Sequence, residues 1–192
     1  MTRLNSRIHE VIVTTIAENG QPHSAPMGVS EVSGYFHVKP FQPSQTYDNL
    51  KRTGQCTLNF TDDVRIFAGA LTGHRDWPTR PCNKIDGAYL TAALAHIELK
   101  IAKVDDLQPR ACFYGELVAE EIHAPFRGFN RAQSAVIEAA ILASRLQMLP
   151  TEKIQQELAY LTIAIEKTAG ERELEAWGWL MDKIKQAGIN IE

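Results

Sequence analysis

Histidine and cysteine side chains are common ligands of protein-bound metals, and their spacing in this sequence matches no metal-binding motif. The six histidines form neither an H-x-x-H nor an H-E-x-x-H pair: His9, His23, His37, His74, His96 and His123. The three cysteines form no C-x-x-C pair: Cys56, Cys82 and Cys112. We therefore interpret the histidines as structural and the thiols as buried or incidental, and we expect no metal site.

Covalent and nucleotide chemistry also lack their usual signatures. The sequence contains no G-x-S-x-G turn for a serine nucleophile and no G-x-x-x-x-G-K-[ST] phosphate loop. It contains no G-x-G-x-x-G dinucleotide fingerprint either. The residues themselves therefore leave the catalytic side chains unknown.

The stretch "KPFQPSQTYDNLKR" has the residue types of a phosphate site. It places the hydroxyls of Ser44 and Thr46 at the start of a predicted helix, with Lys51 and Arg52 one turn on. The start of a helix offers unpaired N–H groups and a partial positive charge to an anion. Capping by Ser44 or Thr46 explains these residues without a ligand and is the simpler interpretation of this stretch alone. Asn59 in "LNFTDD" is equally ambiguous, because either a ligand or a loop carbonyl could satisfy its amide.

The stretch "VIVTTIAENGQPHSAPMGVS" predicts a β-hairpin. Asn19-Gly20 joins two β-branched runs and suits a type I′ turn. Pro26 and Gly28 then fall inside the second strand. Proline cannot donate to a sheet ladder and glycine has no side chain, so we expect pairing to stop at "APMG" and to leave backbone open to a loop, a partner chain or a flat ligand.

The elements that position these residues are mostly strands in the first two-thirds of the chain. β-Branched and alternating patterns predict strands over Glu10–Ala17, Gln21–Ser30, Tyr35–Lys39, Gln55–Thr61, Thr91–Lys103 and Ala111–His123. Their order favours an antiparallel barrel. Short helices are predicted over "SQTYDNLKRTG" and "DDVRIFAGALTG", each ending at a glycine. The segment His74–Gly87 has no period and is expected to be a loop, long enough to act as a lid.

The composition changes near residue 127. Three segments with helical apolar spacing follow, with predicted ends at Thr151, Gly170 and Gly188. We therefore divide the chain into a domain of residues 1–127 and a C-terminal helical subdomain of residues 128–192. The helices of this subdomain should pack through their apolar faces, because isolated helices of this length are marginal in water.

Composition and charge narrow the choice of partners. Hydrophobic residues make up 44% of the 192-residue chain and charged residues 22%, which is typical of a globular protein. A net charge of −3 without a basic run argues against nucleic acid as a partner. No apolar stretch approaches the ~20 residues of a membrane span, and the first residues lack the core of a signal peptide. The odd number of cysteines agrees with a reducing compartment, so we expect a cytoplasmic protein. The lack of a long apolar stretch leads us to expect no membrane partner.

Four segments together resemble a known family in content and in order. They are "EVIVTTIAENGQPHSAPMGV" (10–29), "QTYDNLKRTGQCTLNFTDD" (45–63), "FNRAQSAVIEAAILASRL" (129–146) and "EKTAGERELEA" (166–176). Over nearly the whole chain, the sequence resembles the DUF447 family of FMN-binding split-barrel flavoproteins. The resemblance implies an α+β fold in which an antiparallel split β-barrel of the FMN-binding type precedes a C-terminal three-helix subdomain.

The resemblance also implies a site for FMN. In split-barrel proteins the flavin ring lies against open strand backbone near a dimer seam, which implies a homodimer. The implied cofactor-binding residues are Pro26, Met27 and Gly28 at the ring, Ser44, Thr46 and Asn49 at the phosphate, Asn59 near the ring or ribityl chain, and Arg131 as a further phosphate ligand.

Three functions remain open at this point, because a fold does not decide a function. The first is an FMN-dependent oxidoreductase or flavin reductase that acts on a small-molecule substrate with an electron donor, the flavin carrying the redox chemistry. The second is a non-catalytic module that binds FMN or a deazaflavin. The third is a dimerisation scaffold without a ligand.

Overall fold

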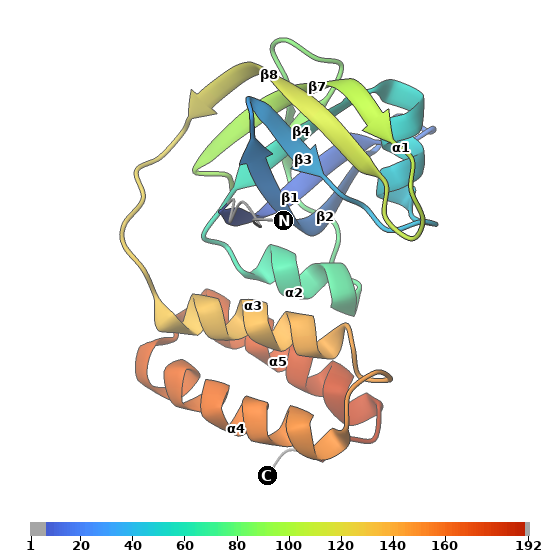
Figure 1. The fold of residues 1–192 in the computed structure, drawn as a ribbon. Helices are drawn as coiled ribbons and strands as arrows, with labels where there is room; N and C mark the ends of the chain where they lie inside the picture. Colours follow the sequence, from blue (N-terminus) through green and yellow to red (C-terminus); the bar gives the residue numbers. More distant parts are fainter. Residues whose placement is uncertain (1–6, 191–192) are drawn as a thin grey trace. The chain divides into compact units, whose positions relative to one another are not determined.

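The structure, a computed structural model, describes residues 7–190. Six antiparallel strands form a closed barrel in the order β1-β2-β3-β8-β7-β4 (Figure 1). The barrel strands are β1 (Ile8–Ile16), β2 (Pro22–Val32), β3 (Tyr35–Val38), β4 (Gln55–Phe60), β7 (Ala95–Asp105) and β8 (Cys112–Ile122). The helices are α1 (Gln45–Thr53), α2 (Arg65–Thr72), α3 (Arg131–Ala143), α4 (Thr151–Thr168) and α5 (Glu171–Gln186). The α+β barrel and its six predicted strands are confirmed, with strand ends shifted by a few residues.

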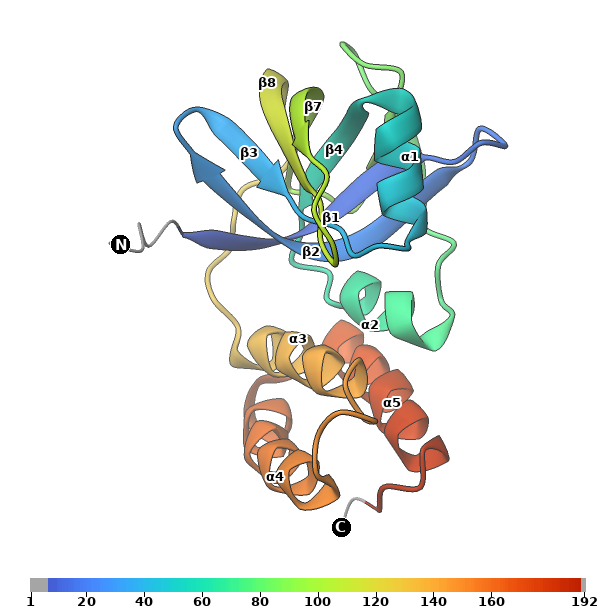
Figure 2. The same cartoon turned by 45° about the vertical axis from the view of Figure 1, so that its right-hand side comes forward.

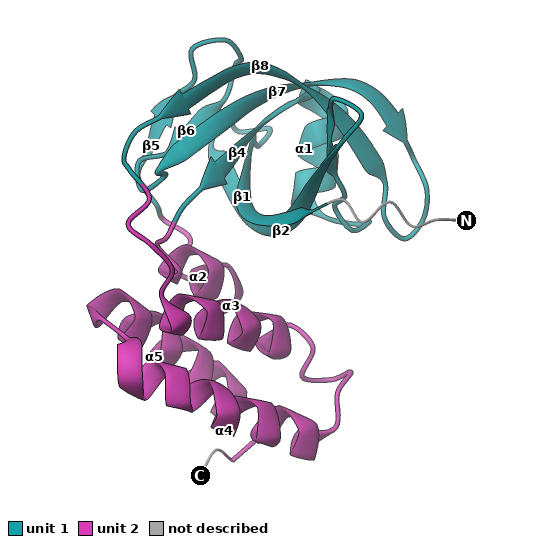
Figure 3. Cartoon of the chain, turned by 60° about the vertical axis from the view of Figure 1, so that its left-hand side comes forward, with its two compact units in different colours: residues 1–61, 77–125 teal, residues 62–76, 126–192 magenta. Residues whose placement is uncertain are grey.

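The chain forms two compact units (Figure 3). The first comprises residues 1–61 and 77–125 and contains the barrel, and the second comprises residues 62–76 and 126–192 and contains α2 to α5. Residues 62–76 group with the C-terminal helices because Val64 and Ala68 belong to the same apolar cluster as those helices. The division into a flavin-binding domain of residues 1–127 and a helical subdomain of residues 128–192 stays a prediction.

The β1–β2 hairpin is paired without a break, so the expectation that pairing stops at "APMG" was wrong. The register runs from Ile8 opposite Ser30 to Ile16 opposite Pro22, and Pro26 lies within it. Alternate residues of an antiparallel strand turn their N–H away from a given partner. A proline at such a position removes no hydrogen bond from that ladder.

The turn of this hairpin also differs from the predicted type I′ turn. Gly20 has a φ of 82°, but Asn19 does not have a positive φ. The N–H of Gly20 donates to the carbonyl of Ala17 at 3.0 Å, and the N–H of Ala17 donates to the carbonyl of Gln21 at 2.8 Å. The asparagine side chain accepts the N–H of Gln21 at 3.1 Å, so it stabilises the turn through its own hydrogen bond.

The barrel core follows from the alternation of side chains along the strands. Val11 and Val13 of β1, Leu58 of β4 and Leu99 of β7 are at most 1% exposed and fill the interior. Leu50 of α1 belongs to the same apolar cluster. α1 contacts β1 and β2 and packs against the barrel (Figure 2). This places the start of α1, with its hydroxyl residues, beside the barrel.

The segment that was expected to be an aperiodic loop contains a strand. β5 (Thr79–Pro81) pairs antiparallel with β6 (Ala88–Leu90), and we call residues 79–90 the β5–β6 hairpin. β6 contacts β4 and β1, and all three of its residues are buried. A strand of three residues is too short to show a period in the sequence, which explains why it was missed.

The helical unit has its own apolar core. It is formed by side chains of α2, α3, α4 and α5, among them Ala68, Val136, Leu158 and Leu180. The three predicted C-terminal helices are confirmed. Between residues 7 and 190, no helix is both long enough and apolar enough to span a membrane.

Candidate functional site

A buried polar band crosses the outer face of the barrel. Residues directly opposite each other on neighbouring strands point to the same face, so the register defines rows across the sheet. One row is Pro26, Ile12, Asn59 and His96, and the next is Ser24, Thr14, Thr57 and Glu98. Both rows point away from the core, because the residues adjacent to them in sequence fill the interior.

β6 covers part of this band through hydrogen bonds from barrel side chains to its backbone. The hydroxyl of Thr57 donates to the carbonyl of Ala88 at 2.7 Å. The side-chain oxygen of Asn59 accepts the N–H of Leu90 at 2.7 Å. These contacts leave Thr57 and Asn59 with 0% exposure although they lie outside the barrel core.

Asn59 is satisfied by the protein itself. Its amide nitrogen donates to the carbonyl of Ile12 at 2.9 Å and to the hydroxyl of Thr14 at 3.1 Å, and its oxygen holds β6. The side chain therefore joins β1, β4 and β6. Its role in binding a cofactor stays a prediction.

The "PMG" residues divide between the two faces of the barrel wall. Met27 packs against the barrel core, whereas Pro26 and Gly28 lie on the outer face. A Cβ on Gly28 would lie 2.9 Å from Cγ2 of Ile8, so only glycine fits without moving that side chain. β3 pairs with β2 only at residues 30–32. Within the described range, the edge of β2 that faces away from β1 thus has no strand partner over residues 22–29.

The start of α1 has unused hydrogen-bond donors. Ser44 caps the helix, because its hydroxyl accepts the N–H of Tyr47 at 3.2 Å. Thr46 is only 3% exposed, and its hydroxyl has no hydrogen-bond partner among residues 7–190. The backbone N–H groups of Gln45 and Thr46 likewise have no partner in that range. The capping alternative thus applies to Ser44 and not to Thr46.

The basic residues of α1 are engaged elsewhere. Lys51 and Arg52 lie in the last turn of the helix, at the opposite end from Thr46. Nζ of Lys51 lies 2.9 Å from a carboxylate oxygen of Asp106, and the Arg52 guanidinium donates to the carbonyl of Ile16. Asn49 is 4% exposed and donates to the hydroxyl of Thr15 at 2.9 Å, which ties α1 to β1. The expected support of a phosphate by these two cations is therefore not seen.

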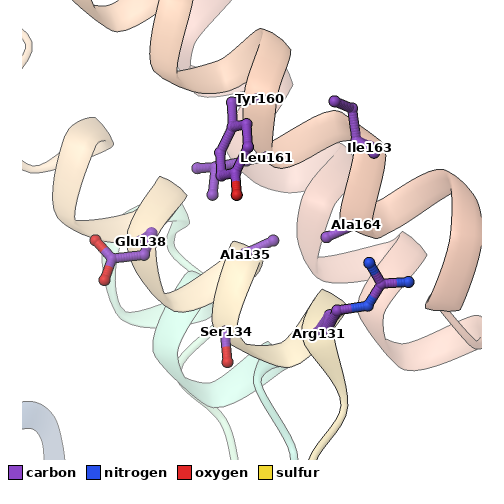
Figure 4. A pocket seen from close by; sticks show the side chains of 8 residues that line it. All are labelled: Arg131, Ser134, Ala135, Glu138, Tyr160, Leu161, Ile163 and Ala164. Carbon is purple, nitrogen blue, oxygen red and sulfur yellow. The ribbon is translucent and has the colours of Figure 1, made fainter.

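Arg131 lies in the helical unit and is the first residue of α3. Its guanidinium forms no hydrogen bond or ion pair within residues 7–190. With Ser134, Glu138 and Tyr160 it lines a largely apolar cavity of about 240 Å³ between α3 and α4 (Figure 4). Asn130, and not Arg131, caps the helix. The assignment of Arg131 to a phosphate stays a prediction.

The structure assembles a titratable cluster that the sequence analysis missed. His96 and Glu98 of β7 lie near His123, which follows β8, and Cys82 and Glu121 lie within the same cluster. His96 and Glu98 are 0% and 1% exposed. No sequence motif identifies the cluster, because its members are spread over residues 82–123 and come together through the pairing of β7 with β8 and through the β5–β6 hairpin, which contains Cys82. The i,i+2 spacing of His96 and Glu98 on a predicted strand was the one local signal available.

Glu98 is ionised in spite of its burial. Burial raises the pKa of this carboxyl, but three hydrogen bonds to the charged form outweigh that effect and lower its pKa below the usual value. The backbone N–H groups of Asn83 and Lys84 donate at 2.8 and 2.7 Å, and Nε2 of His96 lies 3.5 Å away.

Two family models match the chain over most of its length. The model described as "Protein of unknown function (DUF447) N-terminal domain" matches residues 9–124, and that described as "Protein of unknown function (DUF447)" matches residues 130–182. The chain belongs to the DUF447 family. This confirms the expected family, and the two matched segments lie on either side of residue 127.

Solved structures with the same fold include a DUF447 protein. An FMN-bound DUF447 protein from Methanosarcina mazei is 19% identical, with a TM-score of 0.79 over 94% of this chain and 96% of that one. The flavin reductase component of a bacterial two-component tryptophan halogenase is 20% identical, with a TM-score of 0.51 over 62% and 83%. An FMN-binding protein from Thermus thermophilus is 16% identical, with a TM-score of 0.52 over 63% and 74%. These similarities establish the split-barrel fold.

In this DUF447 chain, the predicted site residues fall in three places. Pro26, Gly28 and Asn59 share the outer barrel face, whereas Met27 points to the core. Ser44, Thr46 and Asn49 lie on or next to α1. Arg131 lies on α3 in the other unit.

Proposed function

We propose that this DUF447 protein binds FMN and acts as an oxidoreductase or flavin reductase on a small-molecule substrate, with a separate electron donor. The similarity to an FMN-bound family member over nearly the whole chain carries the proposal. The neighbour named as a flavin reductase component supports the redox role. When bound, the flavin supplies the hydride and electron transfer, and the protein supplies binding and orientation.

The start of α1 fits the phosphate of such a cofactor. Two backbone N–H groups and the Thr46 hydroxyl are available there, and the helix dipole favours an anion. Lys51 is paired with Asp106, so the donors that α1 itself offers to the phosphate are neutral and act together with the helix dipole. Ser44 positions these donors by capping the helix. Asn49 supports the same donors by holding the helix on the barrel through its hydrogen bond to Thr15.

The outer edge of β2 fits a flat ring or a partner chain. Its main chain is unpaired over residues 22–29 on the side away from β1, within the part of the chain that the structure describes. Gly28 has no side chain on that stretch, and Pro26 has no N–H that needs a strand partner. We therefore include a homodimer through the barrel in the proposal, because an unpaired strand edge is a surface that a second chain can cover.

The proposal assigns cofactor binding to the domain of residues 1–127 and a supporting role to residues 128–192, with Arg131 as a further phosphate ligand. It includes a cytoplasmic location without nucleic acid or membrane partners. The net charge of −3 and the odd number of cysteines support this part.

The alternative is a non-catalytic module that binds FMN or a deazaflavin. The donors at the start of α1 fit it equally well, because a phosphate site can hold a cofactor whether or not the flavin turns over.

The absorption spectrum of freshly purified protein tests both possibilities, together with the spectrum of the supernatant after heat denaturation. A flavin spectrum that a nicotinamide donor bleaches rapidly supports the enzyme. A flavin that only dithionite reduces supports the binding module or a different donor. A protein that stays colourless after FMN is added contradicts both and leaves the dimerisation scaffold.

A further inference from the structure

A histidine pair lies beside the β5–β6 hairpin, and the proposed flavin chemistry does not use it. Nδ1 of His96 and Nε2 of His123 lie 2.8 Å apart. The two rings are parallel to within 5°, and their centroids are 5.0 Å apart. The distance between the centroids equals the distance between the nitrogens plus about half a ring width on each side. The two rings therefore lie end to end in nearly one plane, with the two nitrogens facing each other.

Such geometry indicates a hydrogen bond rather than a shared metal ion. A zinc ion lies ~2.0–2.1 Å from each histidine nitrogen and on the lone pair of both. Nitrogens that face each other directly leave no position that satisfies this condition. Tyr89 of β6 stacks on both rings, with centroid distances of 4.1 Å to His96 and 4.8 Å to His123.

Two carboxylates flank the histidine pair and also hold the hairpin. Glu98 faces Nε2 of His96 and accepts the backbone N–H groups of Asn83 and Lys84. Oε1 of Glu121 lies 3.9 Å from Nδ1 of His123, and its other oxygen accepts the side-chain amide of Asn83 at 3.4 Å. The connection between β5 and β6 is therefore held by the same two carboxylates that contact the histidines.

These contacts determine how many protons the pair can carry. Because Glu98 is an acceptor, Nε2 of His96 carries a proton and its Nδ1 accepts one from Nε2 of His123. Nδ1 of His123 can take one extra proton, which would face Glu121. A second extra proton would have to bind Nδ1 of His96, where it would meet the N–H of His123.

We propose that His96 and His123 form a proton-operated clasp, which holds the β5–β6 hairpin on the barrel with up to one extra proton and releases it when a second binds. Release separates Tyr89 from the two rings and frees the hairpin backbone from Glu98. It also uncovers Asn59 and Thr57, whose polar atoms hold β6.

Cys82 and Tyr89 are further titratable side chains next to the pair. Burial raises the pKa of Cys82 to about 12, so this neighbour stays a thiol. Tyr89 covers the rings through its apolar face. Glu98 and Glu121 are therefore the charged groups that face the pair from β7 and β8, and the loop contributes backbone and amide donors.

The direction of the pH dependence follows from the proton count. The released state binds more protons than the docked state, so docking weakens as the pH falls. The effect reaches at most about tenfold per pH unit for one proton. The clasp does not depend on whether the protein binds FMN.

Hydrogen–deuterium exchange of the purified full chain at about pH 7.5 and about pH 5, corrected for the intrinsic exchange rate, tests the clasp. We expect protection of residues 79–90 to fall about tenfold or more at the lower pH, while a reference peptide from α4 keeps its protection. In His123→Gln the amide still offers a donor to His96 but takes no proton, so the fall should disappear. His37→Gln is the control and should keep the fall in protection, because His37 contacts Tyr114 and is not part of the pair.

Several results overturn the proposal. Equal protection of residues 79–90 at both pH values in the wild-type chain would by itself rule out the clasp. A pH dependence that persists in a folded His123→Gln protein also does so. Elemental analysis that finds one equivalent of zinc in the purified chain, lost in His123→Gln, would assign a metal site instead.

Discussion

Replacing Thr46 by valine removes one hydroxyl from the start of α1 and keeps the shape of the side chain. The hydroxyl has no hydrogen-bond partner among residues 7–190, and Ser44 provides the cap. We therefore expect the free energy of unfolding to change by less than ~1 kcal/mol, because no cap is lost. Under the flavin proposal, the phosphate loses a hydrogen bond to a charged group, worth ~1.5–3 kcal/mol. FMN affinity should then fall about ten- to a hundredfold.

Fluorescence quenching of FMN, measured beside the melting temperature, separates the two quantities. Thr46→Ala should lower FMN affinity to a similar degree, whereas Thr46→Ser keeps the hydroxyl and should retain most of the binding. Ser44→Ala serves as the matched control for capping and should cost ~1 kcal/mol of stability. Unchanged FMN affinity in both Thr46→Val and Thr46→Ala would refute the reasoning and place the phosphate elsewhere, with Arg131 as the next residue to test.

Four further predictions concern the identity of the cofactor, the oligomeric state, the contacts of Asn59 and the ionisation of Glu98. The cofactor released by heat should be FMN, and chromatography that recovers only FAD would contradict this. Sedimentation should give twice the mass of one chain, and a monomer alone would exclude the barrel dimer. Asn59→Leu leaves the N–H of Leu90 unpaired and removes the side-chain donor to Ile12, and urea unfolding should show a loss of about 1–3 kcal/mol; a loss within error would mean that β6 is held otherwise. Because the pKa of Glu98 is lowered on folding, its stabilisation is present above the usual carboxyl pKa and lost as the pH falls through the lowered one. Glu98→Gln should therefore flatten the acid side of the stability curve, and an unchanged acid side would show that this carboxyl is not responsible.

The positions of the strands and helices could be predicted because their signals are local. Alternating apolar residues such as Val11 and Val13 mark a strand with one face in the core. Helix ends depend on single residues, as Ser44 and Gly54 show for α1. The short strand β5 carries no such signal and was missed.

The orientation of a single residue could not be predicted from the sequence. The sequence shows that Pro26 cannot donate a hydrogen bond, but the direction in which its missing N–H would point depends on the register with β1. Likewise, Ser44 and Thr46 were equivalent candidates for the cap until the backbone placed the Ser44 hydroxyl at the N–H of Tyr47.

By itself, the sequence determined the α+β barrel, the C-terminal helices, the DUF447 family and the hydroxyl residues at the start of α1. These depend on residue order and on patterns a few positions long. Only the tertiary structure placed Asn59 and His96 in one row, left the outer edge of β2 unpaired, and joined His96 to His123 under Tyr89. The physical reason is that these arrangements depend on which strands pair and in which register, and pairing between distant strands is decided by the packing of the whole barrel.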